Sequence, residues 1–216
     1  MTKKIIESIN ERYSDLAETS CCLSCGGAIT HGNASKGEVC VDLGSGRGLE
    51  VIKLAEQVGQ KGFAYGVDIS DGMLKKAKNT AKKMDIQNVE FIKSELENIL
   101  IESNSVDLVI SNCTINHAKN KTAVWSEIYR ILKPQGRFVV SDIFSSEKVP
   151  SEYATDPDAV AECWAGSVTK DVYLNTLKFV GFQNINIIEE SQPYEKGKIS
   201  VSSFTIAGVK KTCCSK

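Results

Sequence analysis

The sequence lacks an excess of charge of either sign. Its 216 residues include 26 lysines and arginines against 27 aspartates and glutamates, which gives a net charge of −1 at neutral pH. A protein that binds nucleic acid needs a basic face that neutralises phosphates. The balanced composition gives no sign of such a face, so we expect no nucleic-acid partner.

Long apolar runs are also absent. Residues 1–8 place two lysines and a glutamate around two isoleucines, which is too much charge and too little apolar sequence for a signal peptide. No stretch approaches the roughly 20 apolar residues that cross a bilayer. We therefore expect a cytoplasmic protein with no membrane partner.

Internal repeats and low-complexity tracts are missing as well. The length suits one domain with a full hydrophobic core. We expect that domain to cover residues 1–209, with an N-terminal helix and a cysteine-rich lid loop in residues 1–37. Residues 210–216 form a cysteine-containing tail that we expect to be mobile.

Cysteine, by contrast, is abundant, with eight residues. Structural disulfides are rare in a reducing compartment, so the cysteines are better interpreted as metal ligands, redox groups or a site for a soft ion. Cys21 and Cys22 lie close to Cys25 in the sequence. Cys22 and Cys25 have C-x-x-C spacing, which is compatible with zinc or with a redox pair. Cys40 falls within a predicted strand, where a small buried hydrophobic residue is expected.

The most informative stretch of the chain is a strand, a glycine-rich turn and a helix. The apolar run 39–43 predicts a buried strand, and residues 49–57 predict a helix. Glycines in the turn allow a ligand to approach the backbone, and the helix N-terminus adds unpaired N–H groups. The dinucleotide fingerprint G-x-G-x-x-G is not met, because Leu49 stands at its third glycine. Asp42, just before the turn, would repel a pyrophosphate and attract an ammonium group.

Strands and helices alternate along the rest of the chain. Further strands are predicted at 63–68, 89–93, 106–111, 137–143, 182–188 and 201–209. Helices are predicted at 3–17, from 70 or 71 onward, and at 122–132, 158–165 and 169–179, with loops at 18–37 and 145–157. This order predicts a Rossmann-like, doubly wound α/β fold with a mainly parallel seven-stranded sheet and helices on both faces. No helix precedes the last strand, so we expect it to be antiparallel.

Four segments carry a resemblance to a known enzyme class. They read Asp42–Gly46 (DLGSG), Gly66–Asp68 (GVD), Val106–Cys113 (VDLVISNC) and Leu132–Arg137 (LKPQGR). The chain resembles the class I methyltransferases that use S-adenosylmethionine (SAM), in which a D-x-G-x-G loop wraps the methionine end of the cofactor. A Rossmann-like turn for another nucleotide is the alternative. The resemblance implies SAM as cofactor and places its amino acid end at Asp42, Gly44, Ser45 and Gly46.

The remaining cofactor contacts are expected along the same edge of the sheet. Asp68 ends the second strand, where a carboxylate can accept hydrogen bonds from both ribose hydroxyls, and Ile69 follows it. Tyr13 either contacts the cofactor from the N-terminal helix or packs into the core. Met73 either touches the adenine edge or is a core methionine.

The resemblance also implies an adenine site after the third strand. There the methyltransferases commonly place an acidic group near the adenine amine, and this chain carries Ser94, Glu95 and Leu96. Open α/β sheets bind ligands beyond the carboxyl ends of their strands. Asn112 and Cys113 follow the fourth strand, so we expect them beside the transferred methyl group.

Two further segments are similar to the arsenite methyltransferases, which hold trivalent arsenic on cysteines. They read Ser111–Asn116 (SNCTIN) and Glu162–Ser167 (ECWAGS). Carried over by motif, the implied arsenic ligands, which would also be the catalytic residues, are Cys25, Cys113 and Cys163. Soft thiolates select soft ions, and three of them leave the arsenic lone pair free to attack the methyl group. The enzyme then mainly aligns the two reactants.

Several features keep other interpretations open. Cys21 and Cys22 either bind arsenic as extra ligands, relay the ion to the site, or have no role. A cellular thiol reductant is expected as a partner. His117 stands where the arsenite enzymes carry a leucine, so the acceptor is alternatively a small organic molecule, such as a quinone precursor or a thiol. His117 or a thiolate would activate that acceptor. A third hypothesis is a non-catalytic zinc module built on the cysteines at 21, 22 and 25 and the tail pair at 213 and 214.

Overall fold

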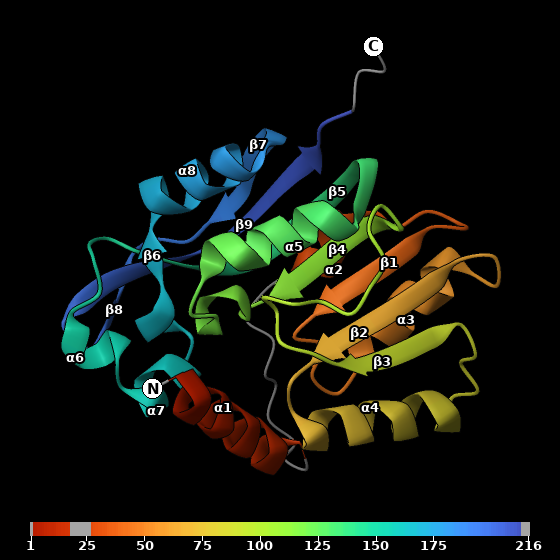
Figure 1. Cartoon of the computed structure of the whole chain (residues 1–216), viewed down its shortest axis with the longest axis horizontal. Helices are drawn as coiled ribbons and strands as arrows, with labels where there is room; N and C mark the ends of the chain where they lie inside the picture. The colour runs from red at the N-terminus through yellow and green to blue at the C-terminus, as the bar shows by residue number, and fades with distance from the viewer. Residues whose placement is uncertain (1, 18–26, 213–216) are drawn as a thin grey trace.

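A computed structural model describes residues 2–17 and 27–212 of the chain (Figure 1). Cys21, Cys22 and Cys25 of the predicted loop and the two tail cysteines lie outside these ranges. The strands are β1 (Val39–Leu43), β2 (Phe63–Asp68), β3 (Val89–Lys93), β4 (Val106–Asn112), β5 (Leu132–Ser145), β6 (Val168–Thr169), β7 (Phe182–Glu190), β8 (Tyr194–Lys196) and β9 (Ile199–Lys210).

Helices flank this set of strands. The α-helices are α1 (Thr2–Leu16), α2 (Ala28–Gly32), α3 (Leu49–Val58), α4 (Asp71–Lys83), α5 (Lys121–Ile131), α6 (Ser151–Ala154), α7 (Pro157–Ala161) and α8 (Lys170–Val180). Two short 3-10 helices, η1 (Ile115–His117) and η2 (Trp164–Gly166), follow β4 and α7. None of the helices in the described ranges combines the length and apolar character that crossing a bilayer requires.

The strands form one mixed sheet in the order β3-β2-β1-β4-β5-β9-β7. β1 pairs in parallel with β2 and β4, and β4 pairs in parallel with β5. β9 is antiparallel to both of its neighbours, β5 and β7. The predicted fold class, mainly parallel with an antiparallel last strand, is therefore confirmed. Two short strands were not predicted, because β6 and β8 span only two and three residues and carry no periodic signal.

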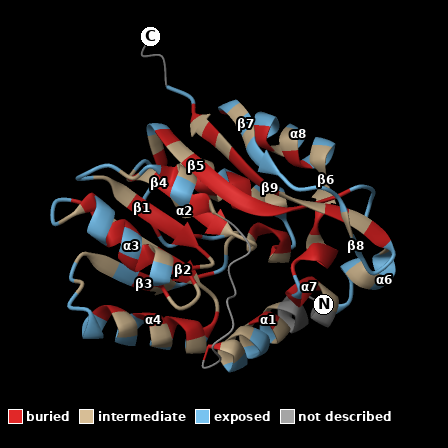
Figure 2. Ribbon diagram, turned by 180° about the vertical axis from the view of Figure 1, so that it is seen from behind, coloured by how far each residue is buried: buried red, intermediate tan, exposed pale blue. Residues whose placement is uncertain are grey.

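Each face of the sheet carries its own hydrophobic core. Along β1, Val41 and Leu43 face the core under α5 and α8, while Cys40 faces the core under α2, α3 and α4. Alternate side chains of a strand point to opposite faces, so this single strand contributes to both cores. Figure 2 shows buried residues along the central strands and exposed ones on the outer faces of the helices. Cys40 is fully buried, as expected, and burial raises the pKa of its thiol to about 12.

Three predicted segments differ from the structure. The predicted loop 18–37 contains α2, a five-residue helix with no side-chain cap, which is too short for a periodic pattern. The predicted loop 145–157 contains α6. The predicted helix 158–165 is instead α7 followed by η2, because the chain between them takes a positive φ of 76° at Cys163. A residue whose backbone has a positive φ cannot continue a right-handed helix.

Lys210 joins the last strand to the end of α5. Its Nζ donates to Asn104 Oδ1 and to the backbone oxygens of Tyr129 and Leu132, each at 2.7 Å. The residue is buried, and Nζ also lies 4.7 Å from the centre of the Tyr129 ring. The ammonium group therefore satisfies carbonyls at the C-terminal end of α5, which have no partner within the helix.

We predict that Lys210→Met destabilises the protein by about 2–4 kcal/mol, because it removes the charged donor of one buried and two partly buried acceptors. Chemical denaturation monitored by circular dichroism measures the change. The neighbouring Lys211 is exposed, so Lys211→Met is the control and should leave the free energy of unfolding nearly unchanged. Equal stability of the two variants would contradict a role for Lys210 at the helix end.

Candidate active site

A pocket opens beyond the carboxyl ends of β1, β2 and β4, beneath α1. Its empty volume is about 1040 Å³, including the open mouth. Helix α1 packs against α4 and α7 and so bridges the two sides of the pocket (Figure 1). The predicted residues that line the pocket are Tyr13, Gly44, Gly46, Asp68, Ile69, Met73, Ser94, Glu95, Leu96, Asn112 and Cys113.

The glycine turn after β1 forms one wall of the pocket, and its backbone at Gly44 packs very closely on the Thr114 side chain. Gly44 has a φ of +72°, and a Cβ at this position would lie 2.0 Å from Thr114 Oγ1. The Thr114 hydroxyl is held in place because it donates to the Asn112 backbone oxygen at 2.9 Å. Only glycine fits here, for reasons of both backbone conformation and space.

Asp68 is fixed at the end of β2 by two backbone groups. Its Oδ2 accepts from Gly46 N and its Oδ1 accepts from Ser70 N, both at 2.8 Å. Burial raises the pKa of Asp68, and these hydrogen bonds oppose the shift. Each carboxylate oxygen retains a lone pair that can accept from a hydroxyl in the pocket.

Two more carboxylates lie behind the glycine turn. Asp42 is only 3% exposed and does not line the pocket, and Ser45 is buried beside it in the turn. Burial raises the pKa of Asp42 well above its ordinary value, and the charges of Glu50 and Asp68 add to the shift. Burial also raises the pKa of Glu50, against a hydrogen bond from Asn112. Three clustered carboxylates favour a cationic ligand, because a positive charge would relieve their repulsion.

Asn112 connects three segments at the pocket. Its Nδ2 donates to Glu50 Oε2 at 2.6 Å, and its Oδ1 accepts from Ala28 N at 3.3 Å. The amide thus joins α3 and β4 to the start of α2. Because both ends of the amide have protein partners, Asn112 contributes to the pocket mainly by shaping its wall.

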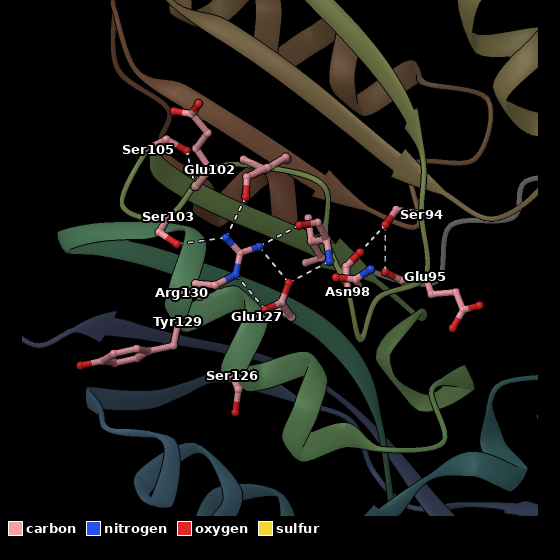
Figure 3. Close-up of polar contacts among 12 residues, drawn as sticks. Ser94, Glu95, Asn98, Glu102, Ser103, Ser105, Ser126, Glu127, Tyr129 and Arg130 are labelled. Atoms are coloured by element: carbon pink, nitrogen blue, oxygen red, sulfur yellow. Dashed lines mark hydrogen bonds and ion pairs between the residues drawn. The ribbon is translucent and has the colours of Figure 1, made fainter.

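The wall that carries Ser94, Glu95 and Leu96 is held from behind by α5 (Figure 3). Ser94 Oγ donates to the Asn98 backbone oxygen at 2.6 Å. Arg130 Nη2 donates to the Ile99 backbone oxygen at 2.7 Å and to Glu127 Oε2 at 2.8 Å. The same Glu127 oxygen accepts from Ile99 N at 2.8 Å. These contacts fix the loop after β3 relative to the sheet.

Tyr13 and His117 meet where α1 closes over the pocket. The Tyr13 hydroxyl lies 3.5 Å from His117 Nε2 and donates to the Ala161 backbone oxygen at 3.4 Å. Burial raises the pKa of Tyr13, and the nearby Cys163 adds to the rise. Burial, with the Lys121 charge, lowers the pKa of His117 to about 4. At neutral pH the pair is therefore an uncharged phenol and an uncharged imidazole.

Two of the predicted cysteines are adjacent. Cys163 Sγ lies 3.3 Å from both the Cys113 backbone oxygen and Asp142 Oδ1, and its single hydrogen can be donated to either acceptor. Cys113 lines the pocket, whereas Cys163 is buried just behind it. Both have positive φ, 51° and 76°, a strained conformation that clusters at functional sites. Residues 50 apart in sequence are thus brought together at one end of the pocket.

Some predicted site residues lie outside the described part of the chain, and some residues that line the pocket were not predicted. Cys21, Cys22 and Cys25 lie outside the described residues. The pocket residues not predicted as cofactor contacts are Ile6, Ile9, Glu97, Thr114, His117, Ala118 and Lys119. The helical spacing of Ile6, Ile9 and Tyr13 was a usable signal, because it places all three on one face of α1. Thr114 carried no signal, since its position depends on the approach of the glycine turn.

Comparisons with known proteins agree with this geometry. Residues 34–181 match the family model described as a methyltransferase domain. An arsenite methyltransferase of Halobacterium salinarum is 35% identical over 173 residues, which cover 80% of this chain and 44% of the relative. A demethylmenaquinone methyltransferase of Geobacillus sp. is 33% identical over 107 residues, covering 50% of this chain and 46% of the relative. The chain thus spans less than half the length of these curated relatives.

Among solved structures, an arsenic(III) S-adenosylmethionine methyltransferase from Chlamydomonas reinhardtii superimposes with a TM-score of 0.78 at 27% identity. The match covers 97% of this chain and 75% of the other. The fold and the glycine-turn pocket are those of an α/β enzyme that binds its cofactor at the carboxyl edge of the sheet. The chain belongs to the methyltransferase domain family, in the class that takes SAM as methyl donor.

We predict that Gly44→Ala weakens SAM binding at least about tenfold, roughly 1.4 kcal/mol, because the new Cβ displaces Thr114. Isothermal titration calorimetry measures the affinity. Gly37→Ala is a matched control: Gly37 also has a positive φ, +86°, but a Cβ there meets nothing within 4 Å. It carries the same backbone strain, of about 1 kcal/mol, and should bind SAM normally. An equal loss in both variants would mean that strain, and not the close approach, limits binding.

We predict that His117 makes the protein acid-sensitive. Its pKa in the folded protein, about 4, lies below the ordinary value of 6.5, so the unfolded chain binds an extra proton between these values. The stability that His117 contributes is complete above pH ~6.5 and is lost as the pH falls toward ~4, by up to about 1.4 kcal/mol per pH unit.

Denaturation of wild type and His117→Leu at several pH values measures this effect. The difference in free energy of unfolding between the two proteins should shift in favour of the leucine variant as the pH falls through that window. A difference that does not vary with pH would show that His117 titrates normally.

Proposed function

We propose that this protein transfers a methyl group from SAM to trivalent arsenic held by the thiolates of Cys25, Cys113 and Cys163. The observation that carries the proposal is the contact between Cys163 Sγ and the Cys113 backbone at the end of the pocket. The 35% identity to an arsenite methyltransferase over 80% of this chain supports the choice of acceptor.

The pocket suits the cofactor in charge and in shape. The carboxylates of Asp42, Glu50 and Asp68 provide the negative potential that an α-ammonium group requires, and Asp68 can accept the ribose hydroxyls. At Gly46 a Cβ would meet only Met73 Sδ, at 4.0 Å, so the turn presents bare backbone to the ligand there. When bound, SAM supplies a methyl group on a sulfonium centre. The segment of Ser94, Glu95 and Leu96, with Met73, remains our proposed adenine site.

Chain connectivity allows Cys25 to reach the other two cysteines. The backbone N–H of Ala28 donates to Asn112 Oδ1, and Asn112 directly precedes Cys113. Three peptide links join Cys25 to Ala28 and span at most about 10 Å. The anchor at Ala28 therefore permits Cys25 to share a site with Cys113.

The chemistry asks little of the protein beyond thiol ligands and alignment. Thiolates bind soft centres, and arsenic with three sulfur ligands keeps a lone pair that is the nucleophile. No proton has to be removed from the acceptor, so no general base is needed. His117, with a pKa of about 4, is a poor base at neutral pH. The cysteines must be reduced, which suits a cytoplasmic location and a cellular thiol reductant as partner.

A quinone precursor is the second candidate acceptor, favoured by the 33% identity to a demethylmenaquinone methyltransferase over half of this chain. Its methylation would need an activating group but no set of thiol ligands. The two functions therefore differ in their dependence on the cysteines.

We predict that the purified protein forms methylarsenic from arsenite and SAM, and that Cys113→Ser or Cys163→Ser each lowers the rate at least about 100-fold, because a hard hydroxyl replaces a soft ligand. Product is separated by liquid chromatography and quantified by arsenic mass detection, with a phosphine reductant that lacks thiols.

Cys40→Ala is the control, because this buried cysteine belongs to the core beneath α2, α3 and α4 and should leave the rate unchanged. If no methylarsenic forms, or if both serine variants match wild type, the arsenite proposal is wrong. Transfer to a demethylated quinone that is insensitive to the cysteine replacements would establish the second candidate.

A further inference from the structure

Asp142 is a buried carboxylate that the proposed function has not yet used. It lies on β5, is only 2% exposed and does not line the pocket. Its Oδ1 accepts from Asn116 Nδ2 at 2.7 Å, from its neighbour Ile143 N at 2.9 Å and from Cys163 Sγ at 3.3 Å. Its Oδ2 accepts from Asn116 N at 3.2 Å.

Three N–H groups and the Cys163 thiol surround this carboxylate. A buried carboxylate needs hydrogen bonds that replace its hydration, and three N–H groups supply them. The Cys163 thiol is a further donor, and its hydrogen bond opposes the rise in the pKa of Asp142 that burial causes. For Cys163, the single thiol hydrogen has two acceptors at 3.3 Å, the Cys113 backbone oxygen and Asp142 Oδ1. The carboxylate is the stronger acceptor, because hydrogen bonds to charged groups are the stronger kind.

The surroundings keep this acceptor and the Cys163 turn in a fixed relation. Asn116 Nδ2 also donates to the Ile143 backbone oxygen at 2.9 Å, which ties η1 to β5. On the other side, Gly166 packs so closely on η1 that a Cβ would lie 1.9 Å from the Asn116 backbone oxygen. The turn that carries Cys163 and the segment that follows Cys113 therefore meet at Asn116.

We propose that Asp142 is the positioning residue for Cys163, directing the thiol hydrogen away from the pocket end so that the sulfur lone pairs are available beside Cys113. This inference rests on the proposed function, because it assigns to Cys163 the role of a ligand for trivalent arsenic. When arsenite binds there, one S–H and one As–O bond break and one As–S bond forms. The thiol proton leaves with the hydroxide as water, and no oxidant is needed.

The exchange removes one of four donors from Asp142. When the thiol hydrogen is lost, the three N–H groups from Asn116 and Ile143 still satisfy the carboxylate, so the acceptor and the surrounding turn keep their places. Asp142 therefore orders the sulfur before the ion arrives and does not have to move afterwards. Ordering a ligand in advance improves affinity by reducing the entropy lost on binding.

A double-variant cycle tests this role. Arsenite itself is the probe, with affinity measured from tryptophan fluorescence, because Trp164 directly follows Cys163 and is buried beside it. We expect Asp142→Asn to weaken arsenite binding at least about tenfold while SAM affinity stays within about twofold of wild type. In a Cys163→Ser background the same substitution should cause no further loss of arsenite affinity. A purely structural role would instead give equal losses in both backgrounds, which would overturn the proposal.

Ser141→Ala is the matched control. Ser141 is the preceding residue of β5, is equally buried and hydrogen-bonds Thr205 at 2.8 Å on the opposite face of the sheet, so its variant should bind arsenite normally. Wild-type protein that binds no arsenite overturns the proposed function and this proposal together. Wild-type protein that binds arsenite, with no loss in Asp142→Asn, overturns this proposal alone.

A measurement on unsubstituted Asp142 covers the case in which Asp142→Asn does not fold. The infrared S–H stretching band of Cys163 is obtained by subtracting the spectrum of Cys163→Ala from that of wild type. We expect this band at the low frequency of a hydrogen-bonded thiol, and we expect arsenite to abolish it. A band at the frequency of a thiol without a hydrogen bond would contradict the positioning role.

Discussion

The parallel register of β1 with its two neighbours is the constraint on which the pocket depends. Asp42 pairs with Gly66 of β2 and with Ile110 of β4, so the three strands end at one edge. The glycine turn follows β1, and Asp68 and Asn112 are the last residues of β2 and β4. A shift of one residue would turn these side chains to the other face of the sheet and would dismantle the pocket wall. Burial of both faces of β1 by two separate cores prevents such a shift.

The same edge concentrates negative charge that the fold itself has to tolerate. Asp42, Glu50 and Asp68 all have raised pKa values, with burial as the main cause. Such clustering costs stability when no cation is present, and binding a cationic cofactor recovers part of that cost. Placement of these acids beside a glycine turn is therefore better explained by ligand binding than by folding. The methyltransferase family membership agrees with this explanation.

The thiol end of the pocket is organised differently, through polar contacts between segments far apart in sequence. Cys113 follows β4, Cys163 follows α7, and Asp142 belongs to β5. Their proximity depends on the pairing of β4 with β5 and on the close contact of Gly166 with Asn116. The placement of the two cysteines at one end of the pocket is thus a property of the sheet and of the turns that follow it. Asn112 joins the same end of the sheet to the start of α2 through Ala28.

The amino-acid sequence by itself determined the alternation of strands and helices, the glycine turn with Asp42, and the acidic end of β2, because each depends on local periodicity or on a short motif. It also identified Cys113 and Cys163 as a pair by motif, although nothing in their spacing placed them together. Only the tertiary structure decided that Thr114 packs on Gly44, that His117 meets Tyr13, and that Asp142 faces Cys163. These contacts join residues between 21 and 104 positions apart, and no local pattern encodes such distances, since they arise only when the sheet is assembled and both cores are closed.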